Sequence, residues 1–141
     1  MDVPSNTIDL AMAFEGFYSK PYLCPAGYWT IGWGHLCSKD HPPITKEQGQ
    51  RYLAKDLHTA FSGTLRICPI LLMMPEVWLG AICDFVFNLG VGRLQSSTLR
   101  RRINAEEWDD VPYELSRWVY GGGKKLRGLV LRREAESAFF N

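Results

Sequence analysis

Apolar residues recur at helical spacing along much of the chain, which predicts a mainly helical fold. Three apolar residues at four-residue intervals follow residues 45–48, which have the form of a capping box, so we expect a helix from there to beyond residue 60. Apolar residues on nearly every side of the segment 75–90 predict a buried central helix. Further helices are expected at 96–103, about 105–118 and about 126–140.

The first helix is expected to start at a cap residue within 5–7 and to end near Gly16. Its apolar stripe continues at helical spacing into Glu15, and the stripe consists of Ile8, Ala11 and Met12. The Glu15 carboxyl should therefore point with the core-facing side chains, where partial desolvation raises its pKa and keeps it protonated near neutral pH, as a general acid requires. A buried glutamate that only satisfies an arginine is the structural alternative.

Residues 18–35 change to aromatic and β-branched types around the turn signal at 25–27, which predicts two short paired strands. Pairing that is symmetric about the turn places Cys24 opposite Tyr28. Because side-chain direction alternates along a strand, Thr30 then lies on the same face of the ribbon as Cys24.

Composition is that of an ordinary globular domain, with 46% hydrophobic and 22% charged residues in 141. No apolar run approaches the ~20 residues that span a bilayer, and residues 1–6 do not have the form of a secretory signal. Net charge is −2 over residues 1–90 and +3 over residues 91–141, where 10 Lys/Arg face 7 Asp/Glu. The basic second half favours an anionic polymer, either nucleic acid or the bacterial wall, although 100–102 alone is equally well explained as a solvated helix face.

The cysteines give no sign of a metal site, because they form no C-x-x-C pair and have no histidine at ligand spacing; they are Cys24, Cys37, Cys68 and Cys83. Without a secretory signal we expect reduced thiols. The apolar neighbours of Cys83 predict a buried free thiol. No metal or cofactor is expected.

The spacing of Glu15, Cys24 and Thr30 resembles the catalytic signature of the phage-type lysozymes, glycoside hydrolase family 24. In that family a glutamate is followed nine positions on by an aspartate or cysteine and six further on by a threonine. The flanking Glu-Gly and Thr-Ile-Gly-x-Gly-His residues also match, as do weaker segments such as 87–90 and 128–136. The resemblance implies an α+β, lysozyme-like fold over 1–141. In it a small lobe with a β-hairpin or sheet (about 16–60) and a larger helical lobe (about 61–141 plus the N-terminal helix) flank a cleft.

The resemblance also implies roles for individual residues. Glu15 would protonate the glycosidic oxygen between N-acetylmuramic acid and N-acetylglucosamine, Cys24 would support the attacking water or the developing cation, and Thr30 would hold that water. Positions that line the sugar cleft are matched by Leu36, Phe87, Asn88 and Thr98. His35 is implied to be structural and to pair with Asp56. A nucleophilic pair of His35 with Cys24 is disfavoured, because nothing in the sequence suggests an oxyanion hole or an acyl substrate.

These observations together predict a monomeric, cofactor-free endolysin that hydrolyses the β-1,4 bond of peptidoglycan, with no nucleic-acid partner and no membrane insertion. It would accumulate in the host cytoplasm and reach the wall through a separate membrane lesion. Two alternatives stay open, a lytic transglycosylase and a catalytically silent wall-binding module. Most glycosidases use two carboxylates, whereas this motif holds one, so the Cys24 thiol is expected to act either as a weak base or only to position water.

Overall fold

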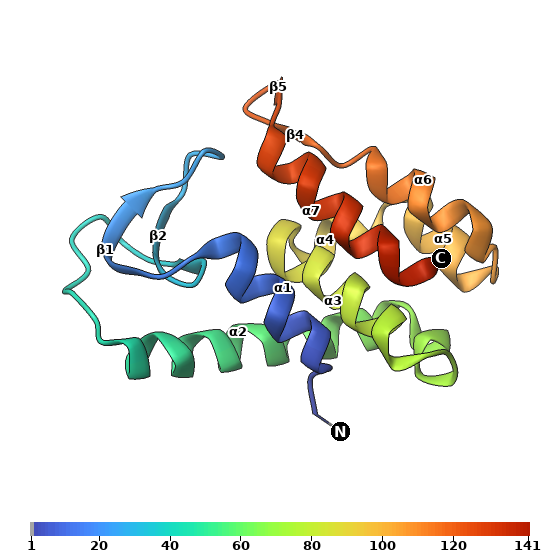
Figure 1. Cartoon of the computed structure of the whole chain (residues 1–141), viewed down its shortest axis with the longest axis horizontal. Coiled ribbons are helices and arrows are strands. Elements are labelled where there is room, and N and C mark those ends of the chain that lie inside the picture. The colour runs from blue at the N-terminus through green and yellow to red at the C-terminus, as the bar shows by residue number, and fades with distance from the viewer. Residues whose placement is uncertain (1) are drawn as a thin grey trace.

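The computed structural model describes residues 2–141 (Figure 1). The α-helices are, in chain order, α1 (Ser5–Glu15), α2 (Lys46–Ile67), α3 (Glu76–Leu89), α4 (Val91–Gln95), α5 (Thr98–Asn104), α6 (Val111–Ser116) and α7 (Arg127–Ser137). Short 3₁₀ helices are η1 (Pro69–Met73), η2 (Trp108–Asp110) and η3 (Ala138–Phe140). The strands are β1 (Tyr18–Leu23), β2 (Trp29–Gly32), β3 (His35–Leu36), β4 (Tyr120–Gly121) and β5 (Lys124–Lys125). The predicted α+β fold is confirmed, with a small antiparallel sheet beside a larger set of helices.

The small sheet has the antiparallel order β1-β2-β3, and its register is the one predicted for the hairpin. Tyr22 pairs with Thr30, and the Cys24 backbone N–H donates to the Tyr28 carbonyl at 2.9 Å, so Cys24 lies opposite Tyr28. On the other side of β2, Thr30 pairs with Leu36 of β3, a strand that the sequence pattern did not predict. Residues that pair across strands, and alternate residues along a strand, share a face of the sheet. One face therefore carries Tyr22, Cys24, Tyr28, Thr30 and Leu36.

Two hydrophobic clusters hold the chain together. The larger one surrounds α3 in the helical part and includes Phe85, Leu99 and Leu115. The smaller one joins the sheet to α1 and α2; its members are Ala11, Trp33, Leu53 and Leu57. Figure 1 shows α2 running beneath both the sheet and the helical body, so this long helix connects the two parts.

Several predicted boundaries are confirmed. The Gln48 N–H donates to Thr45 Oγ1 at 3.1 Å while the Thr45 N–H donates to Gln48 Oε1 at 2.9 Å, which is a complete capping box at the start of α2. Ser97 caps α5 by accepting from the Arg100 N–H at 3.0 Å. The central helix α3 lies between Pro75 and Gly90, as expected.

The first helix begins at Ser5, within the predicted range, but the predicted cap is wrong, because Pro4 and not a residue of 5–7 is the N-cap. The polar side chains there bind the neighbouring helix instead. Asn6 Nδ2 donates to the Val77 carbonyl at 2.9 Å, and Thr7 Oγ1 donates to the Gly80 carbonyl at 2.9 Å. These bonds fix α1 tightly against α3.

The apolar stripe predicted for the first helix is also wrong in part. Ile8 and Met12 are 39% and 37% exposed, while the buried positions of α1 include Leu10 and Ala11. Helical periodicity identifies the apolar side of a helix, but it does not specify which edge of that side packs against the rest of the protein. In α1, small and polar residues allow the closer approach to α3.

The helix predicted at 105–118 is interrupted. Glu106 adopts a left-handed conformation with φ 57°, so the chain reverses after α5 and forms η2 before α6 begins at Val111. Pro112 then occupies the first turn of α6, where its missing N–H costs no helical hydrogen bond.

Within residues 2–141, no helix combines the length and apolar character needed to cross a membrane. The cysteines are free thiols, and Cys83 is buried as predicted. Burial raises the pKa of Cys68 to about 11 and that of Cys83 to about 12, so both thiols stay protonated and packed in the helical part.

The close approach of α1 to α3 makes Gly80 a sensitive position. A Cβ at Gly80 would collide with the Asn6 side chain, which is buried and hydrogen-bonded to Val77. We predict that Gly80→Ala lowers the free energy of unfolding by about 1–3 kcal/mol, measured by urea denaturation.

The matched control is Gly92→Ala in α4, where nothing lies within 4 Å of the added Cβ. That change should be neutral or stabilise by about 0.4–1 kcal/mol. Equal stability of both variants would contradict the tight α1–α3 contact.

Candidate active site

Glu15 ends α1, and its side chain is 17% exposed, so the predicted partial burial is observed. The turn between β2 and β3 lies directly against its carboxyl. A Cβ at Gly34 would come within 2.8 Å of Glu15 Cδ and 2.9 Å of Oε1, and Gly34 has φ +77°. Only glycine satisfies both the conformation and the approach, which gives a physical reason for this residue in the Thr-Ile-Gly-x-Gly-His segment.

A buried arginine from α7 holds the Glu15 carboxyl. Arg132 Nη1 donates to Glu15 Oε2 at 2.5 Å, while its Nε and Nη2 donate to Asp84 Oδ2 and Oδ1 at 2.9 and 2.7 Å. Arg132 is 4% exposed and Asp84 is fully buried. Burial by itself would lower the pKa of Arg132, but hydrogen bonds and charge from Asp84 and Glu15 raise it, so one cation serves two carboxylates.

The arginine partner of Glu15 is the feature that the sequence prediction missed. Glu15 is not an isolated carboxyl among apolar side chains; the arginine considered as the structural alternative is present. Arg132 lies in the segment 128–136, but nothing in that segment indicates its partner. The available signal was Asp84, an acid inside an apolar helix, because a buried charge requires a buried partner.

Cys24 and Thr30 come together through the backbone of Tyr28. Cys24 Sγ accepts from the Tyr28 N–H at 3.4 Å, and Thr30 Oγ1 donates to the Tyr28 carbonyl at 3.0 Å. Cys24 is half-buried and Thr30 is 3% exposed. Because the Thr30 hydroxyl proton is committed to Tyr28, its oxygen is left as an acceptor for a water molecule.

Tyr22 is a further residue of this sheet face that the sequence prediction did not name. It lies opposite Thr30 and stacks on Tyr18, with ring centroids 3.9 Å apart. Burial, followed by the charges of Glu15 and then of Tyr18 and Cys24, raises the pKa of Tyr22 to about 12. The phenol therefore keeps its proton and remains a hydrogen-bond donor. The period-two pattern backwards from Cys24 would have identified it.

The structure brings His35 and Asp56 together. His35 Nδ1 lies 2.7 Å from Asp56 Oδ2, and each side chain is 29% exposed. The imidazole also stacks on Tyr52 of α2, with ring centroids 4.4 Å apart. His35 pairs with Ile31, which alternates with Thr30 along β2, so its side chain lies on the sheet face opposite Cys24. This pair ties β3 to α2.

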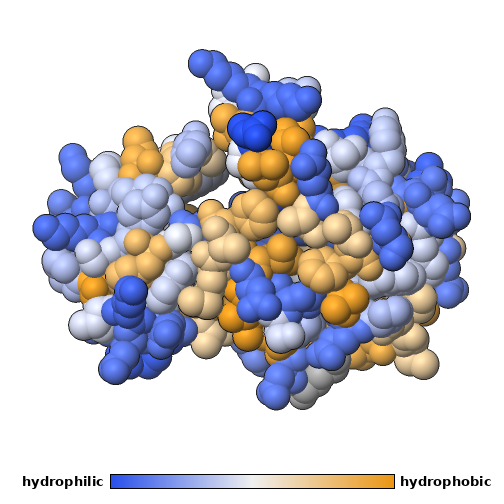
Figure 2. All heavy atoms as spheres, in the orientation of Figure 1, coloured by the Kyte–Doolittle hydropathy of each residue, from blue (hydrophilic) through white to orange (hydrophobic). Residues whose placement is uncertain are grey.

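The molecule is hollowed between its sheet-bearing part and the helical part, as Figure 2 shows. Leu36 is 65% exposed and lies beside Thr30 on the sheet. On the helical side, the Phe87 ring lies 5.9 Å from the Arg132 guanidinium carbon, and Asn88 Oδ1 accepts from Arg133 at 2.7 Å. Phe87 therefore adjoins the arginine that holds Glu15, whereas Leu36 adjoins Thr30 on the sheet and Asn88 adjoins Arg133.

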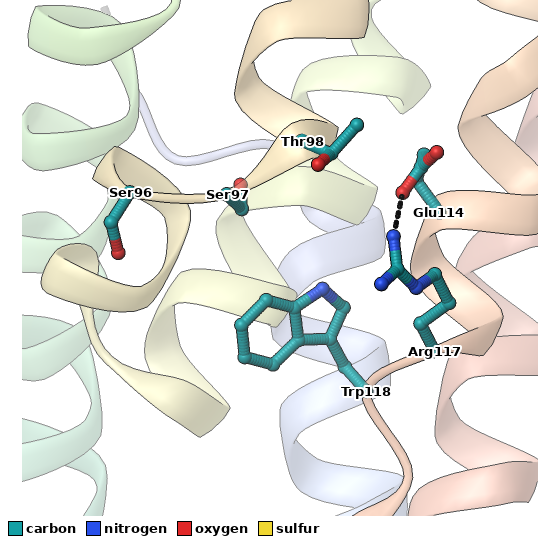
Figure 3. A pocket seen from close by; sticks show the side chains of 6 residues that line it. All are labelled: Ser96, Ser97, Thr98, Glu114, Arg117 and Trp118. Atoms are coloured by element: carbon teal, nitrogen blue, oxygen red, sulfur yellow. Dashed lines mark hydrogen bonds and ion pairs between the residues drawn. The ribbon is translucent and has the colours of Figure 1, made fainter.

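Thr98 lies elsewhere, at the start of α5. It lines a hollow of about 300 Å³ together with the other residues drawn in Figure 3, which are Ser96, Ser97, Glu114, Arg117 and Trp118. It also lines an adjoining hollow of about 360 Å³, where Arg101 donates to its hydroxyl at 2.9 Å. Neither hollow is lined by Glu15, so Thr98 is not brought to the carboxyl.

The residues around Glu15 form a set suited to acid-assisted displacement at an acetal. They comprise the carboxyl of Glu15, the thiol of Cys24, and hydroxyl groups from Thr30 and Tyr22 that can orient water or sugar. Within residues 2–141, no three His, Cys, Asp or Glu side chains come together in a metal-binding arrangement.

Comparison with known proteins gives consistent matches. Residues 12–136 match the model of the family described as phage lysozyme. The chain is 33% identical over 144 residues to the endolysin of Bacillus phage B103, covering 99% of this chain and 54% of that protein. It is 38% identical over 126 residues to the SAR-endolysin of bacteriophage PS119, covering 86% of this chain and 73% of that protein. The active form of the P1 phage endolysin Lyz superposes with a TM-score of 0.84 at 24% identity, covering 98% of this chain and 84% of that one.

The Arg132–Asp84 pair predicts a defined pH dependence of stability. Although burial alone would raise it, hydrogen bonds and charge from Arg132 hold the pKa of Asp84 below its usual value. Such a carboxylate stabilises the fold above its unfolded pKa of about 4 and loses this contribution as pH falls through the folded value. Asp84→Asn should therefore lower the free energy of unfolding at neutral pH by about 3 kcal/mol, and this difference from the parent should shrink below about pH 4.

Urea denaturation at neutral pH and near pH 3 measures both values. The control is Asp110→Asn, since Asp110 is 52% exposed and lies 3.8 Å from Arg102, a surface pair worth less than about 1 kcal/mol. A deficit for Asp84→Asn that stays constant down to about pH 3 would contradict the assignment.

Proposed function

The chain belongs to the phage lysozyme family of peptidoglycan-hydrolysing endolysins, and we propose that Glu15 is the general acid of its reaction. Glu15 protonates the glycosidic oxygen between N-acetylmuramic acid and N-acetylglucosamine. The observation that carries this proposal is the position of the carboxyl. It lies where α1, the β2–β3 turn and α7 meet, and it is partly exposed beside the turn that directly follows the strand of Thr30.

Arg132 supports this role electrostatically. Its pair with Asp84 has no net charge, so an ionised Glu15 is the third charge of the cluster. Arg132 fixes the orientation of Oε2 and stabilises the carboxylate that remains after the proton has been transferred. Because the guanidinium is buried and already bound through Nε and Nη2 to Asp84, it does not rearrange during this step.

Residues on one face of the sheet hold the attacking water. The Thr30 oxygen accepts a hydrogen bond from the attacking water, and Cys24 Sγ acts beside it as an acceptor toward the water or the developing cation. Tyr22 donates a hydrogen bond in the same region. With a thiol in place of a second carboxylate, orientation of the water contributes more than a full negative charge.

The glycan strand lies in the cleft between a small lobe of about 16–60 and a helical lobe of about 61–141 with α1. The residues proposed to contact it are Leu36, Phe87, Asn88 and, farther along the helical lobe, Thr98. The enzyme acts as a monomer on the wall and has no nucleic-acid partner. It accumulates in the host cytoplasm and reaches the periplasm through a separate membrane lesion.

A lytic transglycosylase is the second candidate, because Glu15 is the one carboxylate of the motif and such enzymes work with a single catalytic glutamate. Mass spectrometry of released muropeptides distinguishes the two reactions. Hydrolysis adds one water to each cleaved bond, whereas transglycosylation leaves an anhydro-muramic end.

Replacing Glu15 by Gln tests the general acid. Gln keeps the size and can still accept from Arg132 but has no proton to transfer. Lysis of permeabilised Gram-negative cells should fall by at least ~10²–10⁴, with the melting temperature nearly unchanged.

Glu134→Gln is the control, because Glu134 is an exposed acid on α7 and should not affect lysis. A Glu15→Gln protein that clears cells at close to the parental rate would rule out the assignment. A parent that binds walls without clearing cells would instead identify a silent binding module.

Cys24 is tested by two replacements. Cys24→Asp should keep substantial activity, because it restores the carboxylate that other family members carry. Cys24→Ala should lose most activity, because neither charge nor acceptor remains. Thiol alkylation should inhibit the parent and spare the Asp variant, with Cys37→Ala as the control for the other half-buried thiol. If Cys24→Ala lyses walls as fast as the parent, Cys24 only packs.

A further inference from the structure

Arg133 lies next to Arg132 on α7 and is 1% exposed, yet it has no part in the Glu15 cluster. Its Nη2 donates to Glu136 Oε2 at 2.9 Å, and its Nε lies 2.8 Å from Glu136 Oε1. Its guanidinium carbon lies 5.0 Å from the centre of the Phe85 ring. With the carboxylate on one side and the aromatic ring on another, the guanidinium is held in one orientation.

The same guanidinium fixes the amide of Asn88. Arg133 Nη2 donates to Asn88 Oδ1 at 2.7 Å. An arginine only donates hydrogen bonds, so the amide must turn its oxygen toward Arg133 and its nitrogen away. Within residues 2–141, Asn88 Nδ2 is neither a donor to another protein group nor one of the buried polar atoms that lack a partner. The amide nitrogen therefore points to accessible space with both protons free.

Asn88 lies on α3 near the residues that hold the proposed acid. Asn88 follows Asp84 by one helical turn on the same side of α3, and Asp84 holds Arg132 and through it Glu15. Its neighbour Phe87 lies against the Arg132 guanidinium. The Asn88 amide thus lies one helical turn from the residue that holds Arg132, and next to the residue whose ring contacts that arginine.

We propose that Arg133 is a positioning residue that locks the Asn88 amide with Nδ2 toward the cleft, where it donates to an acetamido carbonyl of the glycan and selects N-acetylated strands. This inference rests on the proposed function. An acetamido carbonyl is an acceptor that matches the amide donor. The ammonium group of an N-deacetylated sugar is only a donor, so it opposes the same NH₂ group.

Asn88→Asp is the direct test, because it keeps the size and the acceptor toward Arg133 but replaces the outward NH₂ by an oxygen. On N-acetylated walls kcat/KM should fall roughly 10- to 100-fold, mainly through KM, without a lower melting temperature. On chemically N-deacetylated walls the variant should match or exceed the parent, because a carboxylate pairs with the ammonium groups.

Arg133→Lys tests the positioning role. Lysine keeps a charge for Glu136 but lacks the planar fork, so the preference for N-acetylated over N-deacetylated walls should fall while the protein stays folded. The control is Asn104→Asp, since the Asn104 amide donates to the Ile67 carbonyl away from the cleft and should not alter the preference. Because Arg133→Lys could unfold, the Asn88 side-chain NH₂ signal of the ¹⁵N-labelled parent is also followed. It should shift with an N-acetylglucosamine oligomer and not with a glucosamine oligomer.

The outcomes distinguish a failure of the proposed function from a failure of the roles assigned to Asn88 and Arg133. A parent that is inactive on N-acetylated walls would overturn the proposed function. A parent that is active while Asn88→Asp keeps its rate and preference would overturn only the role of Asn88. A folded Arg133→Lys protein with unchanged preference, or an Asn88 signal that does not shift with the N-acetylated oligomer, would overturn the locking of the amide.

Discussion

The buried guanidinium of Arg132, held between Glu15 and Asp84, is the interaction on which the arrangement of the site depends. It joins α7 to α1 across 117 residues of sequence and to α3 across 48. A cation removed from water is tolerated only when its partners are well placed, so the three helices cannot shift independently. The packing of the helical part and the orientation of the proposed acid are therefore set by the same contacts.

Helix α1 is fixed at both ends by close approaches rather than by a broad apolar face. Near its start, Asn6 and Thr7 bind carbonyl groups of α3, and Gly80 leaves room for the contact. At its end, the Glu15 carboxyl lies against Gly34 and Arg132. A side chain placed at the last residue of a helix clamped in this way has little freedom, which is what a proton donor at a defined bond requires.

How far the sequence predicts this site depends on the range of each signal. The hairpin register about residues 25–27 follows from a local turn and a period of two, and it correctly placed Cys24 and Thr30 on one face. Periodicity failed at Ile8 and Met12, because it does not specify which edge of an arc is covered. The partners Arg132 of Glu15 and Arg133 of Asn88 depend on contacts between distant segments, which no local pattern encodes. Asp84, an acid inside an apolar helix, was the indirect evidence that such a partner exists.

The proposed chemistry of the cleft relies on oriented neutral groups around a small number of charges. Glu15, Asp84 and Arg132 already leave one negative charge when Glu15 is ionised. Cys24 adds no second carboxylate to this cluster, so the charged groups in direct contact there are those of Glu15, Asp84 and Arg132. Water and sugar must also be oriented, and the Thr30 hydroxyl and the Tyr22 phenol can do this without adding charge. A single charged triad can therefore serve a reaction that most glycosidases carry out with two carboxylates, provided that water and sugar are held in place.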